Sequence, residues 1–245
     1  NHLGIAMAFM NDLDGDGCDE LAISARLEKR NDLTNQGGAR VIFGHGSDEC
    51  GHQGRQINLT AGTAWVQLGN AVGAGDLDGD GLDDLAIGAP YQWLEDANRG
   101  AVWVVPGSVL AGEPTFELGS VEAVEPLVLA EREDVRMIGG VGVAAESGRG
   151  IVITDGHLII GAISDTIGED TGLGTLRIYG TRADGSIDLA ERAIFVGETF
   201  RPGSRMGEVM SLSPDGSQLI IGGRMGSGNG DHNGSAYILD LDRLP

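Results

Sequence analysis

Two short segments of the chain place carboxylates at alternate positions of a loop. In GDLDGDGLDDLAIGAP (residues 75–90), loop positions 1, 3, 5, 6 and 9 are Asp76, Asp78, Asp80, Gly81 and Asp84. Near the start of the chain, the same loop positions are Asp12, Asp14, Asp16, Gly17 and Glu20. Alternating carboxylates, a glycine that permits a sharp bend and a main-chain carbonyl at position 7 are typical of a calcium loop. The spacing therefore predicts two cation sites, one in each loop.

Two other interpretations of these loops compete with metal binding. Aspartate and glycine are common in solvated turns, but carboxylates packed this closely repel one another without a cation, and the pattern occurs twice. An EF-hand needs a bidentate acid at position 12, where this chain has Ile87 and Ile23. The residues after each loop are apolar and β-like. We therefore favour calcium loops that connect β-strands.

The chain is long and strongly acidic. Its 245 residues hold 16 Lys and Arg against 37 Asp and Glu, which gives a net charge of −21 at pH 7. Such a field repels phosphate backbones, so nucleic acid is not an expected partner. No apolar run reaches the roughly 20 residues that cross a bilayer as a helix, and no membrane span is expected. Cys18 and Cys50 leave open whether the chain holds one disulfide or two free thiols.

One short motif recurs four times along the chain. The copies LAISA, LAIGA, LIIGA and LIIGG begin at Leu21, Leu85, Leu158 and Leu219, about 60–75 residues apart. A Gly-rich apolar run precedes each copy and begins at Gly4, Leu68, Ile138 and Met206. A further apolar strand follows each copy, in GGARVIFG, RGAVWVVPG, LGTLRIYG and NGSAYILDL. Each repeat therefore predicts a strand, a turn, a strand, a loop and a strand.

A fourth strand is predicted in three of the repeats, over residues 55–60, 126–131 and 192–197, whereas the last repeat has no room for one. Four-stranded antiparallel sheets repeated radially form a β-propeller, whose crowded innermost strands favour small residues. The expected fold is all-β, a β-propeller of four-stranded antiparallel blades over residues 1–245. Its repeats are predicted at approximately residues 1–64, 65–134, 135–200 and 201–245.

The segments DLDGDGLDDLAIGAP and DLDGDGCDELAISA resemble the FG-GAP repeats of integrin α-subunit propellers and their bacterial relatives. In that family the nine-residue loop lies between the first two strands of a blade and binds calcium. The resemblance implies that one ion is bound by Asp76, Asp78, Asp80, the carbonyl of Leu82 and Asp84. By the same matching, a second ion is bound by Asp12, Asp14, Asp16, the carbonyl of Cys18 and Glu20.

The third and fourth repeats depart from this pattern. When they are aligned on LIIG, the acidic positions are taken by Ile151, Ile153 and His157, or by Leu212, Pro214 and Gln218. In their place stand TDG (residues 154–156) and SPDG (residues 213–216), which are hairpin-turn sequences that join two strands without a metal. We therefore expect calcium in the first two repeats only, as two ions.

Propellers of the resembled family usually have seven blades, whereas four repeats are visible here. We expect a segment of a larger propeller; an unusually small ring, or a ring completed by a partner chain, are the alternatives. The expected function is a calcium-binding extracellular or cell-surface module, an adhesion scaffold that binds a protein or glycan ligand through its loops. The alternatives are a non-catalytic accessory domain of a larger secreted enzyme, and a glycan-binding lectin.

No converging catalytic groups emerge from the sequence, so no enzymatic activity is expected. The histidines lack zinc-site spacing, and no GxSxG nucleophile motif occurs. A formal dinucleotide fingerprint is interrupted by glycines where a helix should follow; its residues are Gly140, Gly142 and Ala145. Trp93, in the loop after LAIGAP, is a candidate anchor for a protein or sugar ligand.

Overall fold

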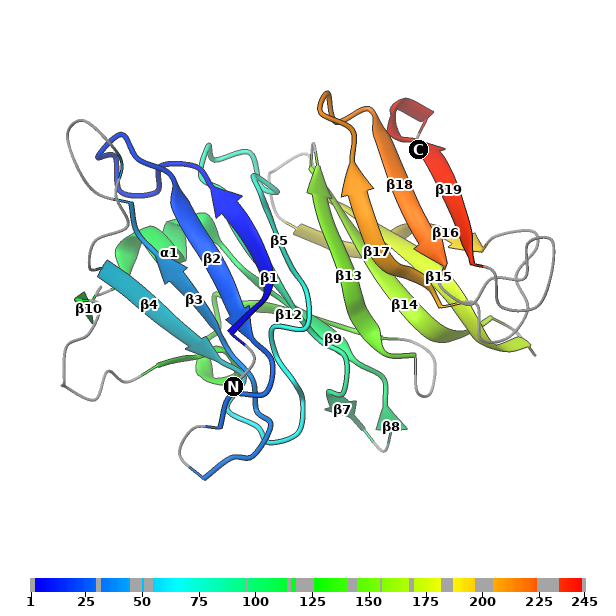
Figure 1. Ribbon diagram of the computed structural model, residues 1–245, viewed down its shortest axis with the longest axis horizontal. Helices are drawn as coiled ribbons and strands as arrows, with labels where there is room; N and C mark the ends of the chain where they lie inside the picture. The colour runs from blue at the N-terminus through cyan, green and yellow to red at the C-terminus, as the bar shows by residue number, and fades with distance from the viewer. Residues whose placement is uncertain are drawn as a thin grey trace.

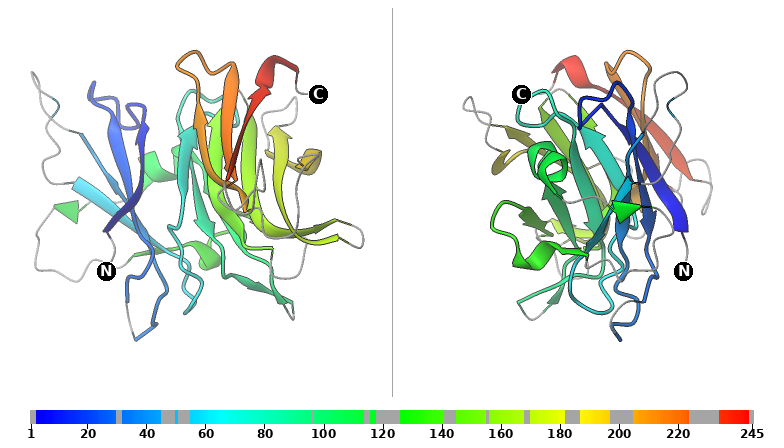
Figure 2. Two further views of the ribbon diagram at one scale, coloured as in Figure 1. Left: turned by 45° about the vertical axis from the view of Figure 1, so that its right-hand side comes forward. Right: turned by 90° about the vertical axis from the view of Figure 1, so that its left-hand side faces the viewer.

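The computed structural model is all-β, with four main sheets, built almost entirely of antiparallel strands, that follow one another along the chain (Figure 1). It describes residues 3–29, 32–44, 50, 55–95, 97–113, 116–117, 126–140, 145–154, 156–167, 170–181, 187–196, 205–223 and 234–243. Helix in these residues is limited to α1 (Gly107–Gly112) and the 3-10 turns η1 (Leu129–Glu131) and η2 (Leu241–Arg243), and no described helix is long and apolar enough to cross a membrane. The all-β prediction is confirmed. In Figures 1 and 2 the sheets form an open arc, without a closed ring in the described part of the chain.

The first sheet contains the four strands predicted for the first repeat. Its strands pair antiparallel in the order β1 (Leu3–Met10), β2 (Glu20–Ala25), β3 (Ala39–Ile42) and β4 (Arg55–Thr60). Two short strands from later in the chain cover the outer edge of β4. Of these, β10 (Phe116–Glu117) pairs with β4 antiparallel, and β11 (Leu127–Val128) pairs with it in parallel. The unprotected strand edge is thereby shortened.

The second sheet lies between its neighbours and is covered on both faces. Its order is β5 (Val72–Gly75), β6 (Asp84–Ala89), β9 (Ala101–Val105) and β12 (Arg136–Gly139). Every residue of β6 and β9 is buried. Because side chains alternate along a strand, Leu85 and Ile87 join the core shared with the first sheet, while Ala86 joins the core shared with the third. A hairpin of β7 (Trp93–Leu94) and β8 (Ala97–Asn98) extends from the connection between β6 and β9.

The third and fourth sheets continue the same up-and-down order. The third consists of β13 (Ser147–Thr154), β14 (His157–Ile167), β15 (Asp170–Thr181) and β16 (Ile187–Val196). The fourth has three strands in the described residues, β17 (Met206–Leu212), β18 (Gln218–Gly223) and β19 (Ser235–Asp240). The three strands expected for the fourth repeat are present.

Two strand predictions are wrong. The fourth strand of the second sheet is β12, whereas residues 127–128 pair with β4 of the first sheet. The Gly-rich run that begins at Ile138 was expected to form the first strand of the third sheet, but Ile138 and Gly139 belong to the outer strand β12, and β13 is the first strand instead. The turn explains the difference: Thr154 pairs with His157, so the strand before it must extend to Thr154. Residues 141–144 of that run lie outside the described residues.

The first strands of all four sheets converge on one cavity of about 330 Å³. The cavity is lined by residues of β1, β5, β13 and β17, which include Ile5, Val72, Ile151 and Val209. The first strands of the four sheets therefore surround a common cavity. This arrangement agrees with the predicted innermost position of the first strands.

Consecutive sheets touch through pairs of glycines. A Cβ atom on Gly88 of β6 would lie 2.1 Å from the carbonyl oxygen of Gly148 in β13, and one on Gly161 of β14 would lie 2.0 Å from that of Gly207 in β17. Gly148 and Gly207 both have positive φ, 89° and 81°. The glycine of the LAIGA motif is therefore required for close packing of the next sheet. Gly222, at the same motif position in the last sheet, has no atom closer than 3.6 Å to its added Cβ.

The glycine contacts predict different costs for one substitution at two equivalent positions. Gly161→Ala should lower the free energy of unfolding by about 2 kcal/mol, because backbone must move to admit the methyl group. Gly222→Ala should change it by less than about 1 kcal/mol, because its surroundings are open. Urea unfolding of both variants followed by circular dichroism measures the difference. Equal effects at the two positions would contradict the packing scheme.

Candidate metal centre

Both acidic loops connect the first two strands of a sheet and lie at the same end of the molecule. The first joins β1 to β2, and the second joins β5 to β6. At the base of each loop the last residue of the first strand pairs with the first residue of the second, Met10 with Glu20 and Gly75 with Asp84. The acid at loop position 9 therefore begins a strand and is drawn into the stack of sheets. Glu20 and Asp84 are accordingly buried, with 0% and 1% of their surface exposed.

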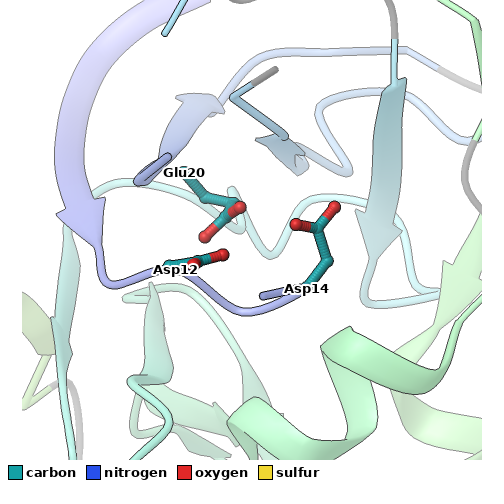
Figure 3. A group of neighbouring side chains, drawn as sticks. All are labelled: Asp12, Asp14 and Glu20. Atoms are coloured by element: carbon teal, nitrogen blue, oxygen red, sulfur yellow. The ribbon is translucent and has the colours of Figure 1, made fainter. Parts of the chain in front are cut away.

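Each loop brings three carboxylates together. Oxygen atoms of Asp12, Asp14 and Glu20 all lie within 4.8 Å of one another (Figure 3). In the second loop the corresponding group is Asp76, Asp78 and Asp84, whose carboxylate oxygens also lie within 4.8 Å of one another. These are positions 1, 3 and 9 in both loops. Six of the predicted ligands are thus gathered into two clusters that could hold a metal ion.

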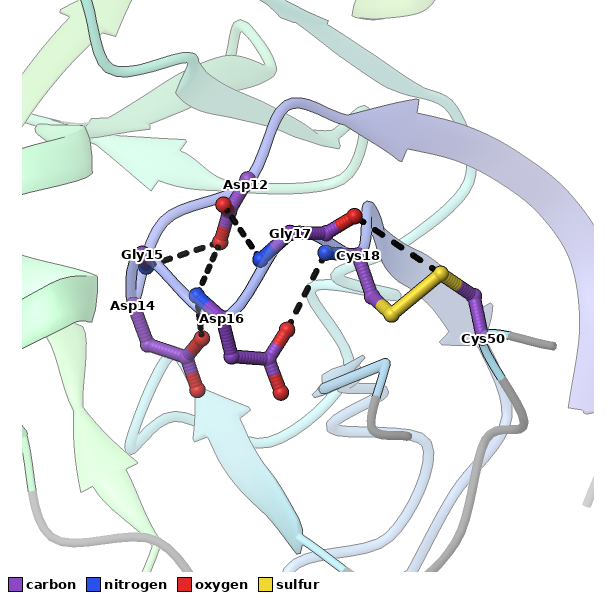
Figure 4. Close-up of a disulfide and its surroundings, with 7 residues drawn as sticks. All are labelled: Asp12, Asp14, Gly15, Asp16, Gly17, Cys18 and Cys50. Atoms are coloured by element: carbon purple, nitrogen blue, oxygen red, sulfur yellow. Dashed lines mark hydrogen bonds between the residues drawn. A yellow bond between two sulfur atoms is a disulfide. The ribbon is translucent and has the colours of Figure 1, made fainter. Parts of the chain in front are cut away.

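The carboxylate at position 1 organises each loop through main-chain amides. Asp12 accepts hydrogen bonds from the amides of Gly15, Asp16 and Gly17, at 2.7, 3.0 and 2.7 Å (Figure 4). Asp76 likewise accepts hydrogen bonds from Gly79 and Gly81, at 2.7 and 3.0 Å. These bonds fold the chain around a carboxylate, so the loops are shaped from within by the acid at their first position.

The remaining predicted ligands lie outside the two clusters. The carboxylate of Asp16 accepts a hydrogen bond from the amide of Cys18 at 3.0 Å, and that of Asp80 accepts one from Leu82 at 2.8 Å. Position 5 thus turns its side chain toward the main chain of position 7. The carbonyl oxygens of Cys18 and Leu82 stay predicted ligands.

Glu20 is the loop acid with an unsatisfied buried oxygen among the described residues. Its Oε2 accepts a hydrogen bond from the amide of Leu13 at 2.9 Å, whereas its buried Oε1 has no hydrogen-bond partner in the described residues. Burial raises the pKa of Glu20 to about 7, and the negative charges of Asp12, Asp16 and Asp19 add to the effect. A buried anionic oxygen without a partner is costly, and a bound cation would supply one.

Asp84 is held more completely by the protein. Its Oδ2 accepts a hydrogen bond from the amide of Leu77, and its Oδ1 accepts one from the amide of Gly107, both at 2.8 Å. Burial nevertheless raises the pKa of Asp84 to about 6, with a further contribution from Asp78 and Asp80. Burial together with the charges of Asp80 and Asp76 also raises the pKa of Asp78. Both loops therefore hold more negative charge than their surroundings neutralise.

The donor set fits a hard divalent cation. All clustered side chains offer carboxylate oxygens, which Ca²⁺ and Mg²⁺ prefer over nitrogen or sulfur ligands. The orphaned Oε1 of Glu20 marks where such an ion would be coordinated in the first loop. One protein cation is near: Arg55 forms an ion pair with Asp14 and stacks over the ring of Phe43. The sequence motif gave no sign of Arg55, which comes from β4.

A disulfide fastens the first loop to a distant segment. Cys18 at loop position 7 is bonded to Cys50, with a Cα–Cα distance of 5.3 Å (Figure 4). The pairing left open by the sequence is thus settled. In the second loop the same position is Leu82, and a Cβ on Gly107 would lie 2.7 Å from the Leu82 side chain. One loop is therefore fixed covalently at position 7, and the other by packing.

The equivalent connections in the third and fourth sheets are short turns. Thr154 and His157 face each other across the first, and the amide of Gly216 donates a hydrogen bond to the carbonyl of Ser213 in the second. Ile151 and Ile153, which align with acidic loop positions, are buried strand residues of β13. No acidic cluster of the metal-binding kind occurs at these two turns among the described residues.

Comparison with known proteins places the second loop within a recognised repeat. Residues 68–105 match the family model described as FG-GAP repeat, and this span contains β5, the acidic loop, β6 and β9. The chain is also 32% identical over 110 residues to integrin alpha-PS5 of Drosophila melanogaster. It carries an FG-GAP repeat and is integrin α-like. The family predicted from the acidic loops is thereby confirmed. The matched region spans 44% of this chain and 10% of the fly integrin.

The raised pKa values predict how the metal-free protein responds to pH. Folding raises the pKa of Glu20 from 4.5 to about 7. It raises the pKa of Asp84 from 3.8 to about 6. The folded state then binds more protons than the unfolded state in this range. The free energy of unfolding should therefore fall as pH rises from 4.5 to 7.

Urea unfolding in the presence of a chelator, repeated at several pH values, measures this slope. Glu20→Gln, which removes one of the two titrating groups, should flatten it. A free energy of unfolding that rises with pH over the same interval would show that ionisation of these two carboxyl groups does not destabilise the folded state.

Proposed function

We propose that the chain is a calcium-stabilised module of a β-propeller, serving as an extracellular scaffold for binding or adhesion. The observation that carries the proposal is the matched pair of carboxylate clusters, each built on a buried acid whose ionised form is disfavoured without a cation. The likeness to integrin α and the FG-GAP repeat point to a non-enzymatic binding domain.

Calcium would relieve the repulsion that the loops contain. Asp12, Asp14 and Glu20 would hold one ion, and Asp76, Asp78 and Asp84 the other, each supplying hard oxygen ligands. The main-chain bonds to Asp12 and Asp76 pre-arrange the loops for this purpose. Ions bound here would fix the ends of β1, β2, β5 and β6, and so stabilise the first two sheets.

An extracellular setting is supported by the Cys18–Cys50 bond. Disulfides persist in oxidising compartments, and calcium is abundant outside cells. The described residues contain no free cysteine. A location at or outside the cell surface also agrees with the likeness to an integrin α subunit.

The calcium proposal predicts a metal-dependent melting temperature. At about 5 mM calcium, with the weak affinity typical of extracellular sites, the midpoint should rise by about 5 °C or more over the midpoint in chelator. Asp12→Asn and Asp76→Asn should each remove roughly half of the shift. Differential scanning calorimetry at fixed ionic strength is the measurement.

Asp19→Asn is the matched control, because Asp19 lies in the first loop outside the carboxylate cluster. It makes the same change of charge as Asp12→Asn. It should keep most of the calcium shift. A midpoint insensitive to calcium in the unaltered protein would refute both sites.

A ligand surface is proposed at the end of the molecule opposite the acidic loops. Trp65, between β4 and β5, and Trp93, in β7, are 60% and 63% exposed. Their segments meet there, since the amide of Tyr91 donates a hydrogen bond to the carbonyl of Val66. Exposed tryptophans are typical anchors of protein interfaces, and Trp93 keeps the role proposed from the sequence.

Trp93→Ala should weaken ligand binding by about tenfold or more if Trp93 is an anchor. Binding to immobilised extracellular-matrix proteins, measured by surface plasmon resonance, tests this; a glycan array run in parallel tests the lectin alternative. Met137→Ala, which shortens a partly exposed side chain of β12, is the control. Unchanged binding by both Trp93→Ala and Trp65→Ala would exclude this surface.

Further sheets of the same kind are proposed to cover the two ends of the arc. The outward face of β1 exposes Leu3, Ile5, Met7 and Phe9. The last sheet exposes Val209 of β17 and the cross-strand pair Ile220 and Ile238. Every other junction in the arc buries such side chains between two sheets. Additional blades would bury these end faces in the same way.

A further inference from the structure

Asn11 links the two acidic loops directly. Its main-chain amide donates a hydrogen bond to Oδ2 of Asp83 at 2.8 Å, and its side-chain Nδ2 donates one to the carbonyl oxygen of Gly81 at 2.8 Å. The amide of Asp83 in turn donates a hydrogen bond to Oδ1 of Asn11 at 2.9 Å. The side-chain amide of Asn11 thus uses both its donor and its acceptor on the other loop.

The bonded residues stand next to the carboxylate clusters. Asn11 precedes Asp12 in the first cluster, and Asp83 precedes Asp84 in the second. Gly81 is bonded to the second cluster as well, because its own amide donates a hydrogen bond to Oδ2 of Asp76. Asp12 is therefore separated from the second loop by one residue, Asn11, which is joined to that loop by three hydrogen bonds.

This link exists only where two acidic loops are neighbours. In the second repeat the residue before the first loop acid is Gly75, which has no side chain and packs against Ile153 of β13. The third sheet has a short turn at that end and no acidic loop with which a link could form. Asn11 thus occupies the single junction, among those described, at which both sides carry a carboxylate cluster.

We propose that Asn11 is a positioning residue that couples the two metal centres, so that an ion in one loop raises the affinity of the other. The proposal rests on the proposed function, which assigns an ion to each loop. In a metal-free loop the repulsion among the carboxylates opposes the arrangement that its main-chain hydrogen bonds favour. The first ion removes this opposition in its own loop and, through Asn11, steadies the other loop, so the second ion binds at a smaller ordering cost.

Negative coupling between the two calcium sites is the alternative, and it also has a physical basis. Two divalent ions repel each other, and without a mechanical link the second would bind with equal or lower affinity than the first. Positive coupling of about five- to tenfold in affinity would lie at the lower end of the usual range for coupled sites. The sign of the coupling therefore decides between the link and simple repulsion.

Calcium titration by isothermal calorimetry tests the coupling. The intact protein should bind two ions with positive cooperativity, whereas Asn11→Ala should bind two ions independently. Asp12→Asn and Asp76→Asn, each with one site removed, supply the affinities of the separate sites. Asn98→Ala makes the same change in the β7–β8 hairpin, away from both loops, and should leave the cooperativity intact.

Hydrogen exchange gives a readout that a merely structural role of Asn11 would not move. In Asp76→Asn, calcium can enter only the first loop, yet the amides of Asp80 and Leu82 in the second loop, whose hydrogen-bond acceptors are unchanged, should become better protected when it does. Adding Asn11→Ala to this variant should abolish the added protection. If Asn11→Ala does not fold, the protection in Asp76→Asn and the comparison of one-site with two-site affinities still decide the question.

The possible failures are distinguishable. Two independent or negatively cooperative calcium sites in the intact protein would overturn the coupling and leave the proposed calcium function standing. Absence of calcium uptake would overturn the metal centres and the coupling together. Cooperativity that survives in Asn11→Ala would assign the coupling to another contact and refute the role of Asn11.

Discussion

Repulsion among carboxylates at the base of two loops is the constraint on which the rest of the structure depends. Glu20 and Asp84 begin strands that are packed inside the stack, so neither can swing out into water. The neighbouring aspartates are held in place by main-chain amides of their own loops. Charge is therefore concentrated where it cannot disperse, and either protons or a cation must compensate it.

The sheets provide the rigidity that keeps these acids in position. Alternate side chains of β6 face the first and the third sheet, and glycines at the crossing points allow the backbones to approach. The disulfide at Cys18 and the packing of Gly107 on Leu82 hold position 7 of each loop by different means. These contacts join the loops to other segments of the chain, the segment of Cys50 and the start of α1, and so restrict the motion of position 7.

Local sequence patterns predicted much of this architecture. The repeated LAIGA motif marked β2, β6, β14 and β18, and the turns TDG and SPDG correctly separated the acidic from the non-acidic connections. The prediction failed where small residues were ambiguous. The run from Ile138 and the start of β13 are both rich in glycine, and only strand pairing distinguishes an outer strand from an inner one. The pairing of residues 127–128 with β4 could not be predicted either, because the two strands lie far apart in the chain.

The sequence by itself determined that each loop gathers acids from alternate positions, because the loop's own bends bring such positions close, although only positions 1, 3 and 9 form the cluster and position 5 turns to the main chain. Only the tertiary structure decided what surrounds them. The burial that raises the pKa of Glu20, the ion pair of Asp14 with Arg55, the Cys18–Cys50 bond and the bridge from Asn11 to Asp83 all require segments from different strands to meet. The spacing of residues within one segment does not predict these contacts between distant segments, because they depend on how the sheets pack.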